Sequence, residues 1–282
     1  MRERIIGTAL ERALTARVPV ATETYSPISH AEFLNELRNK LTNGGYNIEN
    51  QRLFVNGTGT KLVGFFDVQN LAERVPDDFG FRMSIGFKNS YDKTMTAALV
   101  VGATVVICSN GMISGDLITF KRKHRGTVLE ELRTKMDQAI PLMSSSFARL
   151  ITDAEIMRNY ELTPRQKAEI LGVLYFEKEI VTPTQLSIVK RELVNSEHFR
   201  GNSVWDLYNN VTVALKKSYP FRYVEDHIKL HDFMSDIAGI SHAPLSTETQ
   251  ELIAEAESTE ERTDQAVITS ETASEVTAES GF

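Results

Sequence analysis

The feature that most constrains the fold is a series of short apolar segments between about residues 50 and 121, joined by links too short to hold a helix. Leu53-Phe54-Val55 and residues 62–66 flank Asn56-Gly57-Thr58-Gly59, which is typical of a hairpin turn. Phe81–Phe87 alternates with the period of a half-buried strand. Parallel neighbours need long crossover connections, so these five or six strands predict a mostly antiparallel sheet.

The last strands of this region carry two further expectations. Thr96–Val101 and Thr104–Cys108 are short apolar runs interrupted by Gly102, and Leu117–Phe120 is expected to be the final strand. Cys108-Ser109-Asn110-Gly111 is expected to form a polar turn, because Asn-Gly is a common turn signal.

Helical patterns lie on both sides of the predicted sheet. Ser29 and Glu32 form a capping box before a helix that Gly44-Gly45 ends. After residue 125 the period becomes helical, and three helices are expected to start after Thr163, Thr182 and Ser203. The fold class is therefore predicted to be α+β.

Charge is divided unevenly along the chain. The 282 residues include 31 basic and 38 acidic residues, and residues 241–282 alone hold ten of the acids but only one base, Arg262. That segment is too polar to form a core, so we expect a disordered acidic tail. The remaining body is almost neutral, with 30 bases and 28 acids. We expect a sheet region at 1–125, a helical region at 126–240 and the tail at 241–282; whether the first two are separate domains is left open.

Composition excludes several classes of protein. The single cysteine, Cys108, excludes a disulfide framework and a cysteine-rich zinc site, and suits the cytoplasm of a cell. No apolar run is long enough to cross a membrane. His227 and His231 are four residues apart, but Ile228 stands where a metalloprotease needs glutamate, so surface histidines are expected in place of a metal site. No catalytic fingerprint is found, and we expect neither an enzyme nor a cofactor.

Three segments are candidates for contact with nucleic acid. One is a basic run directly after the last predicted strand. The second interleaves bases with aromatic residues, although its aromatics would serve equally well in a core. The third is the loop before Thr96, whose cations and tyrosine suit phosphates and bases. The candidate DNA-binding residues are Lys121, Arg122, Lys123 and Arg125 in the first segment, Lys216, Lys217, Tyr219 and Arg222 in the second, and Lys88, Tyr91 and Lys93 in the third.

Two of these turns carry a resemblance to a known family. Asn89-Ser90-Tyr91-Asp92, followed by Cys108-Ser109-Asn110-Gly111, resembles the phage/plasmid-like protein family of unknown function over about residues 50–125. That family usually has histidine where this chain has Tyr91, and glycine where it has Lys93. The resemblance implies a phage or other mobile element as the source and supplies no catalytic residues. More loosely, the size and layout resemble the single-stranded-DNA-binding RNA polymerase cofactors of some podoviruses.

The tail carries a second resemblance. An acidic tail with a terminal phenylalanine, here Phe282, is similar to the tails of bacterial and phage single-stranded-DNA-binding proteins. Such a tail competes with DNA for a cationic groove and docks protein partners through its free end. The tip Ala278-Glu279-Ser280-Gly281 has one acid where those tails usually have a cluster. A tail that only keeps the protein soluble is the alternative.

Together these features predict a non-enzymatic, phage-encoded single-stranded-DNA-binding protein of the host cytoplasm. Its partners would be single-stranded DNA and, through the tail, RNA polymerase or replication proteins, and a homo-oligomer is left open. One alternative is a strand-annealing recombination protein. Another is an enzyme or inhibitor acting on a host target, with Asp92, Ser109 or His227 and His231 as its site residues.

Overall fold

A computed structural model describes residues 2–23, 25–72, 80–92, 94–95, 97–105, 110–120, 128–241 and 250, with the backbone alone at 2–8, 114–120 and 128. The predicted disorder of the tail concerns residues that, apart from Ser241 and Gln250, lie outside this set. Among the described residues, no helix has the length and apolar character that a membrane crossing requires.

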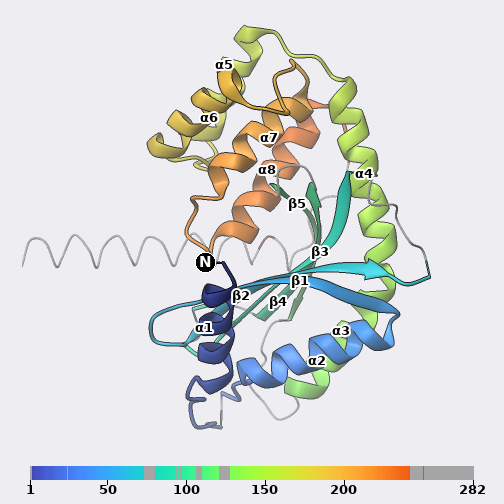
Figure 1. Cartoon of the computed structure of the whole chain (residues 1–282), viewed down its shortest axis with the longest axis vertical. Helices are drawn as coiled ribbons and strands as arrows, with labels where there is room; N and C mark the ends of the chain where they lie inside the picture. Colours follow the sequence, from blue (N-terminus) through green and yellow to red (C-terminus); the bar gives the residue numbers. More distant parts are fainter. Residues whose placement is uncertain are drawn as a thin grey trace, which may run out of the picture.

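The centre of the molecule is a five-stranded sheet in which every strand pairs antiparallel with the next along the chain (Figure 1). The strands are β1 (Tyr46–Val55), β2 (Lys61–Asn70), β3 (Phe81–Ser90), β4 (Ala97–Val105) and β5 (Asn110–Phe120). The predicted antiparallel sheet and the hairpin turn between its first two strands are both confirmed.

Three details of the strand prediction were wrong. Gly102 does not end a strand but lies within β4, beside an irregularity in the pairing with β5. Asn110 and Gly111 belong to β5 and not to a turn. β3 is buried on both faces, because helices cover both sides of the sheet.

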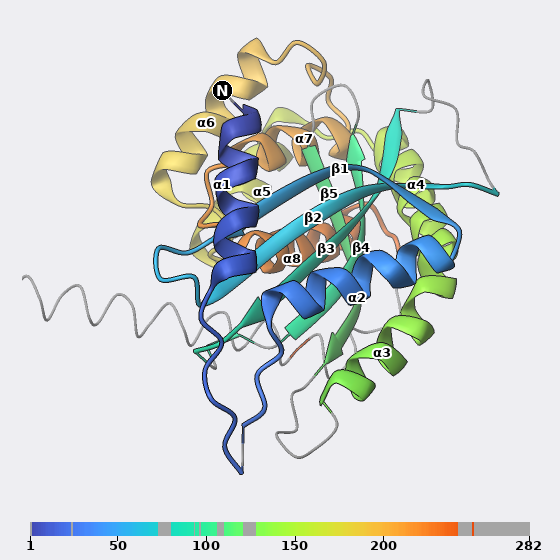
Figure 2. The same cartoon turned by 60° about the horizontal axis from the view of Figure 1, so that its bottom comes forward.

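One face of the sheet packs against the larger apolar core. In Figure 2, α1 (Arg2–Thr15) and α2 (His30–Asn43) lie in front of the strands. The predicted capping box at Ser29 is present, and Phe33, Leu37 and Leu41 of α2 are buried in this core. Two further helices, α3 (Val128–Ala139) and α4 (Met143–Asn159), contribute to the same core and are joined by a 3₁₀ turn at Ile140–Leu142.

The other face of the sheet is covered by α8 (Tyr223–Ile237). Val224 and Ile228 of this helix pack with a smaller apolar cluster that includes Val63 and Val100 from the strands. This second layer explains why alternate residues of the central strands are not exposed to solvent.

The remaining helices form a lobe beyond the sheet, at the top of Figure 1: α5 (Pro164–Phe176), α6 (Pro183–Asn195) and α7 (Val204–Leu215). The helix starts predicted after Thr163, Thr182 and Ser203 are confirmed, each with a capping box. The lobe and the sheet share the larger core: Phe81 of β3 lies 5.6 Å from Trp205 of α7, measured between ring centroids.

Candidate nucleic-acid interface

The meander of strands gathers several polar turns at one end of the sheet. The β1–β2 turn and the β3–β4 turn lie there, because β2 begins opposite the last residues of β3, with Lys61 paired to Ser90. β5 also finishes there, with Phe120 paired to Ala97. We call this end of the sheet, defined by residues 56–60, 91–92, 94–95 and Phe120, the turn end.

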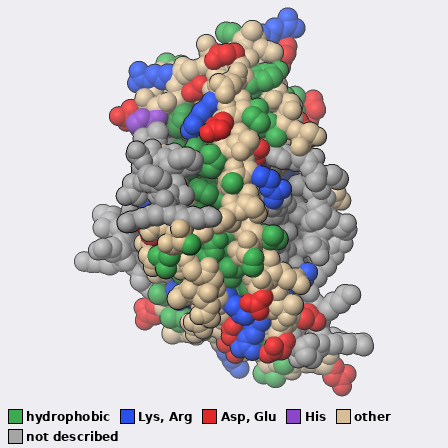
Figure 3. Space-filling view, turned by 90° about the vertical axis from the view of Figure 1, so that its right-hand side faces the viewer, with side chains coloured by type: hydrophobic (Ala, Val, Ile, Leu, Met, Phe, Trp, Pro, Cys, Tyr) green, Lys and Arg blue, Asp and Glu red, His purple; other side chains and the backbone are tan. Residues whose placement is uncertain are grey.

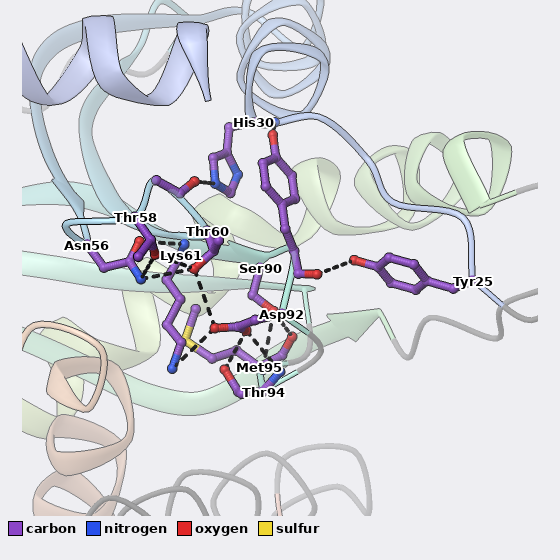
Figure 4. Close-up of polar contacts among 12 residues, drawn as sticks. Tyr25, His30, Asn56, Thr58, Thr60, Lys61, Ser90, Asp92, Thr94 and Met95 are labelled. Carbon is purple, nitrogen blue, oxygen red and sulfur yellow. Dashed lines mark hydrogen bonds and ion pairs between the residues drawn. The ribbon is translucent and has the colours of Figure 1, made fainter. Parts of the chain in front are cut away.

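The two turns are joined to each other by hydrogen bonds (Figure 4). Asn56 donates to the hydroxyls of Thr58 and Thr60 at 2.9 and 3.0 Å. Asp92 lies 3.6 Å from Lys61 Nζ and accepts a 2.6 Å bond from the Thr94 hydroxyl. The Tyr91 backbone N–H also donates to the Thr60 carbonyl at 2.7 Å, so the residues of the β1–β2 turn hold one hairpin against the next.

Tyr91, a predicted DNA-binding residue, lies in the interior with 4% of its surface exposed. Its ring stacks on His30 with centroids 4.0 Å apart and an interplanar angle of 11°. Its hydroxyl accepts a hydrogen bond from the His30 backbone N–H, and its carbonyl accepts one from the Tyr25 hydroxyl. Tyr91 therefore anchors the segment before α2 and does not present a ring to solvent.

The same contacts set the protonation of His30. The Asn89 side-chain amide donates both to the Ile28 carbonyl at 3.0 Å and to His30 Nδ1 at 2.9 Å. Because Nδ1 accepts, Nε2 carries the proton and donates to the Gly59 carbonyl at 3.1 Å. Asn89 of the family-like motif thus orients a neutral histidine. Sequence reasoning missed His30 because its partners are distant in sequence.

Lys88, a second predicted DNA-binding residue, is also buried. Its Nζ lies 2.5 Å from Glu225 Oε1 of α8, and both side chains are almost completely excluded from solvent. The pair ties β3 to the helix that covers the sheet. No local pattern could have identified it, since the partners stand 137 positions apart.

The segment between α7 and α8 is the exposed part of the candidate interface. Lys216 and Lys217 are exposed, and Tyr219 has 59% of its surface exposed. Phe221 turns inward instead, and packs in the cluster that contains Met95 and Ala98 near the turn end. The sequence allowed the aromatic residues of this segment to be either accessible to a nucleic acid or part of the core. Tyr219 is accessible, and Phe221 is part of the core.

Arg222, the last cation of that segment, forms an ion pair with a residue of α8. Arg222 donates to Asp226 Oδ1 at 3.1 Å within the first turn of α8. Burial raises the pKa of Asp226 to about 6, although the positive charge of Arg222 opposes the shift.

The remaining predicted contacts, Lys93, Lys121, Arg122, Lys123, Arg125 and Phe282, lie outside the described residues. The chain enters the run 121–125 directly after Phe120, at the turn end. The face shown in Figure 3 has basic and acidic side chains interspersed, with no continuous basic patch among the side chains coloured there.

The expectation that His227 and His231 lie on the surface is wrong. His227 is fully buried and His231 nearly so. His231 Nε2 lies 3.1 Å from Asp153 Oδ2 of α4. Burial, reinforced by the nearby positive charge of Arg52, lowers the pKa of His227 to about 3, so its ring is neutral.

Gly111 of β5, which lies close to His227 in space, has a packing role. A side chain at Gly111 would bring its Cβ to 2.8 Å from the Tyr223 hydroxyl. Gly111 therefore lets α8 approach β5, which is why an apparent turn signal stands inside a strand.

Within the described part of the chain, no three His, Cys, Asp or Glu side chains are grouped closely enough to hold a metal ion.

Fold and site together define an α+β protein in which helices cover both faces of a five-stranded meander, with polar turns collected at one end. The chain belongs to the family described as Domain of unknown function (DUF932), whose model matches residues 18–235. Neither the curated proteins nor the solved structures contain a match to the chain.

Proposed function

We propose that the protein is a non-enzymatic, phage-encoded single-stranded-DNA-binding protein that acts in the host cytoplasm, in viral transcription as an RNA polymerase cofactor or in replication. The strand passes over the turn end of the sheet. Cations contact the phosphates, and an exposed aromatic ring stacks on a base.

The observation that carries this proposal is topological. One basic segment begins in the sequence directly after Phe120, which lies at the turn end, and a second, about ninety residues later, contributes a side chain to the apolar cluster beside that end. The run 121–125 follows Phe120 at the turn end. Phe221 of the Lys216–Arg222 segment belongs to the same apolar cluster as Met95 and Ala98.

The exposed side chains supply the chemistry that the proposal needs. Lys216 and Lys217 present charge to solvent next to the exposed ring of Tyr219. A base has a π-face whatever its identity, so a single accessible tyrosine suits binding without sequence preference. Lys88 and Tyr91 are not part of the surface, and in our proposal they hold it in shape.

The acidic tail regulates access to this surface. Its carboxylates occupy the same cations until DNA displaces them, because residues 241–282 carry an excess of nine negative charges. Once DNA displaces the tail, Phe282 is available to RNA polymerase or to replication proteins.

The enzyme alternative has less support. It needs Asp92, His227 and His231 to converge, yet Asp92 lies at the turn end, whereas the histidines are buried between α8 and its neighbours. Strand annealing uses the same contacts with DNA and differs from simple coverage in pairing complementary strands, which an annealing assay measures.

Fluorescence anisotropy with labelled oligo-dT and with a duplex of equal length, each at two salt concentrations, tests the proposal. We expect tighter binding of the single strand and a marked loss of affinity at the higher salt concentration. Equal affinity for the duplex, or no binding at low salt, would overturn it.

A further inference from the structure

An exposed aromatic ring lies on the edge of the sheet, close to the turn end. Among the described strands β1 has a neighbour on one side only, and Phe54 near its end has 41% of its surface exposed. Phe54 stands opposite Val63 in the pairing of β1 with β2, so both side chains point to the face that α8 covers. Val63 is buried in the cluster under α8, whereas Phe54 presents its ring to solvent.

Two arginines lie beside the same end of β1. The last turn of α1 lies next to the hairpin that joins β1 and β2 (Figure 2). There the Arg12 guanidinium donates to the Val55 carbonyl at 3.4 Å. Arg17 follows Ala16, which is so close to this hairpin that a Cβ added at Gly59 would lie 3.1 Å from the Ala16 Cβ. Both arginines are exposed, and within the described residues neither forms an ion pair with a carboxylate.

A polypeptide strand that adds to the open edge of β1 is the competing occupant. The Asn56 N–H donates to the Lys61 carbonyl at 3.2 Å, so the alternation of an antiparallel ladder turns the backbone groups of Val55 away from β2. Arg12 already bonds the outward carbonyl of Val55, and a side chain placed there blocks strand addition. A nucleic acid needs no backbone groups of the sheet. It needs cations for its phosphates and a ring for a base, and both are present here.

We propose that the end of β1 is a second contact surface for the single strand, on which Phe54 stacks on a base while Arg12 and Arg17 contact neighbouring phosphates. The inference rests on the proposed function and extends its binding surface from the turn end to the open edge of β1. These three residues are absent from the candidates that the sequence supplied, because only the fold brings α1 to the end of β1.

The new surface is continuous with the exposed ring of Tyr219. The ring centroid of Tyr219 lies 5.2 Å from that of Phe221, which belongs to the same cluster as Val63. Since Val63 stands opposite Phe54, the two exposed rings border one buried layer. One strand can therefore stack on both rings.

Anisotropy titrations of labelled oligo-dT with Phe54 variants test the stacking. Phe54→Leu keeps an apolar side chain but removes the ring, so the affinity should fall about tenfold, whereas Phe54→Trp should keep it. A protein-binding role for this side chain would give no such loss. Phe176→Leu removes an exposed ring from the helical lobe and is the matched control, which should leave the affinity unchanged.

The salt dependence of the same titrations tests the arginines. Replacing Arg12 and Arg17 together by glutamine removes two phosphate contacts and should lower the salt slope by about 1.4, at about 0.7 for each contact. Arg165→Gln, at an arginine of α5 whose side chain is 89% exposed, should leave the slope unchanged.

The tryptophan introduced by Phe54→Trp also reports the contact directly. The chain's own tryptophan, Trp205, is 4% exposed and supplies a nearly constant background. Oligo-dT should quench the added fluorescence as binding saturates, because the indole ring then stacks on a thymine. Circular dichroism and thermal melts should show that both Phe54 variants fold like the original protein.

The outcomes separate this surface from the proposed function. If the original protein binds oligo-dT and neither Phe54→Leu nor the arginine variant changes affinity or slope, this surface is rejected and the proposed function stands. An added tryptophan that bound oligo-dT does not quench also rejects the stacking. If the original protein does not bind oligo-dT, the proposed function and this surface are rejected together.

Discussion

Lys88 of β3 and Glu225 of α8 form a buried ion pair, 2.5 Å between Nζ and Oε1, that joins the sheet to the helix covering it. Lys88→Met leaves Glu225 as an uncompensated buried charge, so we expect the free energy of unfolding to fall by about 3–5 kcal/mol. Urea denaturation measures this.

The double variant Lys88→Met, Glu225→Leu is the control for that prediction. It removes both charges and should recover most of the lost stability, since an apolar pair of similar volume replaces an ion pair at little net cost. A double variant as unstable as Lys88→Met alone would contradict the assignment of the loss to an unpaired charge.

Substitutions at Tyr91 and Tyr219 are expected to have different effects: the first should lower the stability of the protein, and the second should weaken its binding of DNA. Tyr91→Phe removes the acceptor of the buried His30 N–H and should lower stability by about 1–3 kcal/mol, with little direct effect on DNA affinity. Tyr219→Ala should leave stability almost unchanged and weaken oligo-dT binding by about 1–3 kcal/mol. Thermal melts and anisotropy titrations of both variants check the pair; a reversed pattern would contradict the assigned roles.

His227 should make the protein less stable in mild acid. Its pKa is about 3 in the folded protein, against about 6.5 when unfolded, so the unfolded chain binds more protons between these values. Its contribution to stability is fully present above pH 6.5 and decreases as the pH falls toward 3. Between pH 6.5 and pH 5 the loss is about 2 kcal/mol.

His227→Phe provides the comparison for this pH effect. The stability difference between pH 7 and pH 5 should be about 2 kcal/mol smaller in the variant than in the original protein. Comparing the two proteins cancels Asp226, whose raised pKa of about 6 gives a pH dependence of opposite sign, stabilising the protein as the pH falls below 6. Equal pH dependence in both proteins would contradict a neutral buried ring.

Deleting residues 241–282 tests the regulatory role proposed for the tail. The deletion removes an excess of nine negative charges, so oligo-dT affinity should rise, most clearly at low salt where screening is weakest. A scrambled tail of equal composition should restore the weaker binding. Unchanged affinity after deletion would limit the tail to a spacer or a solubilising segment.

The fold was largely predictable because its signals are local. The caps at Ser29, Thr163, Thr182 and Ser203 and the short links between strands depend on residues close together in the sequence. The burial of β3 was not predictable in the same way. Alternation along a strand does not reveal that a helix about 130 residues later in the sequence, α8, covers its second face.

The interior roles of the candidate site residues depend on such distant contacts. Tyr91 and Lys88 have the residue types expected of a DNA surface, yet His30 and Glu225 draw them into the interior. His227 and His231 were misplaced for a related reason: α8 is buried against both the sheet and α4, which its own amphipathic pattern does not show. For the aromatic residues between α7 and α8 the sequence left an exposed and a core role equally open, and the structure contains one of each: Tyr219 is exposed and Phe221 is buried.

The central claim is that two basic segments at the turn end contact the same DNA strand, and the salt dependence of affinity tests it most directly. Oligo-dT binding should be measured over a range of salt concentrations for the original protein and for the variant in which Lys121, Arg122, Lys123 and Arg125 are all alanine. Each lost phosphate contact lowers the salt slope by about 0.7 for a single strand, so the account predicts a slope smaller by about 2 to 3. Replacing Lys216 and Lys217 should lower it further. An unchanged slope in both variants would contradict the account.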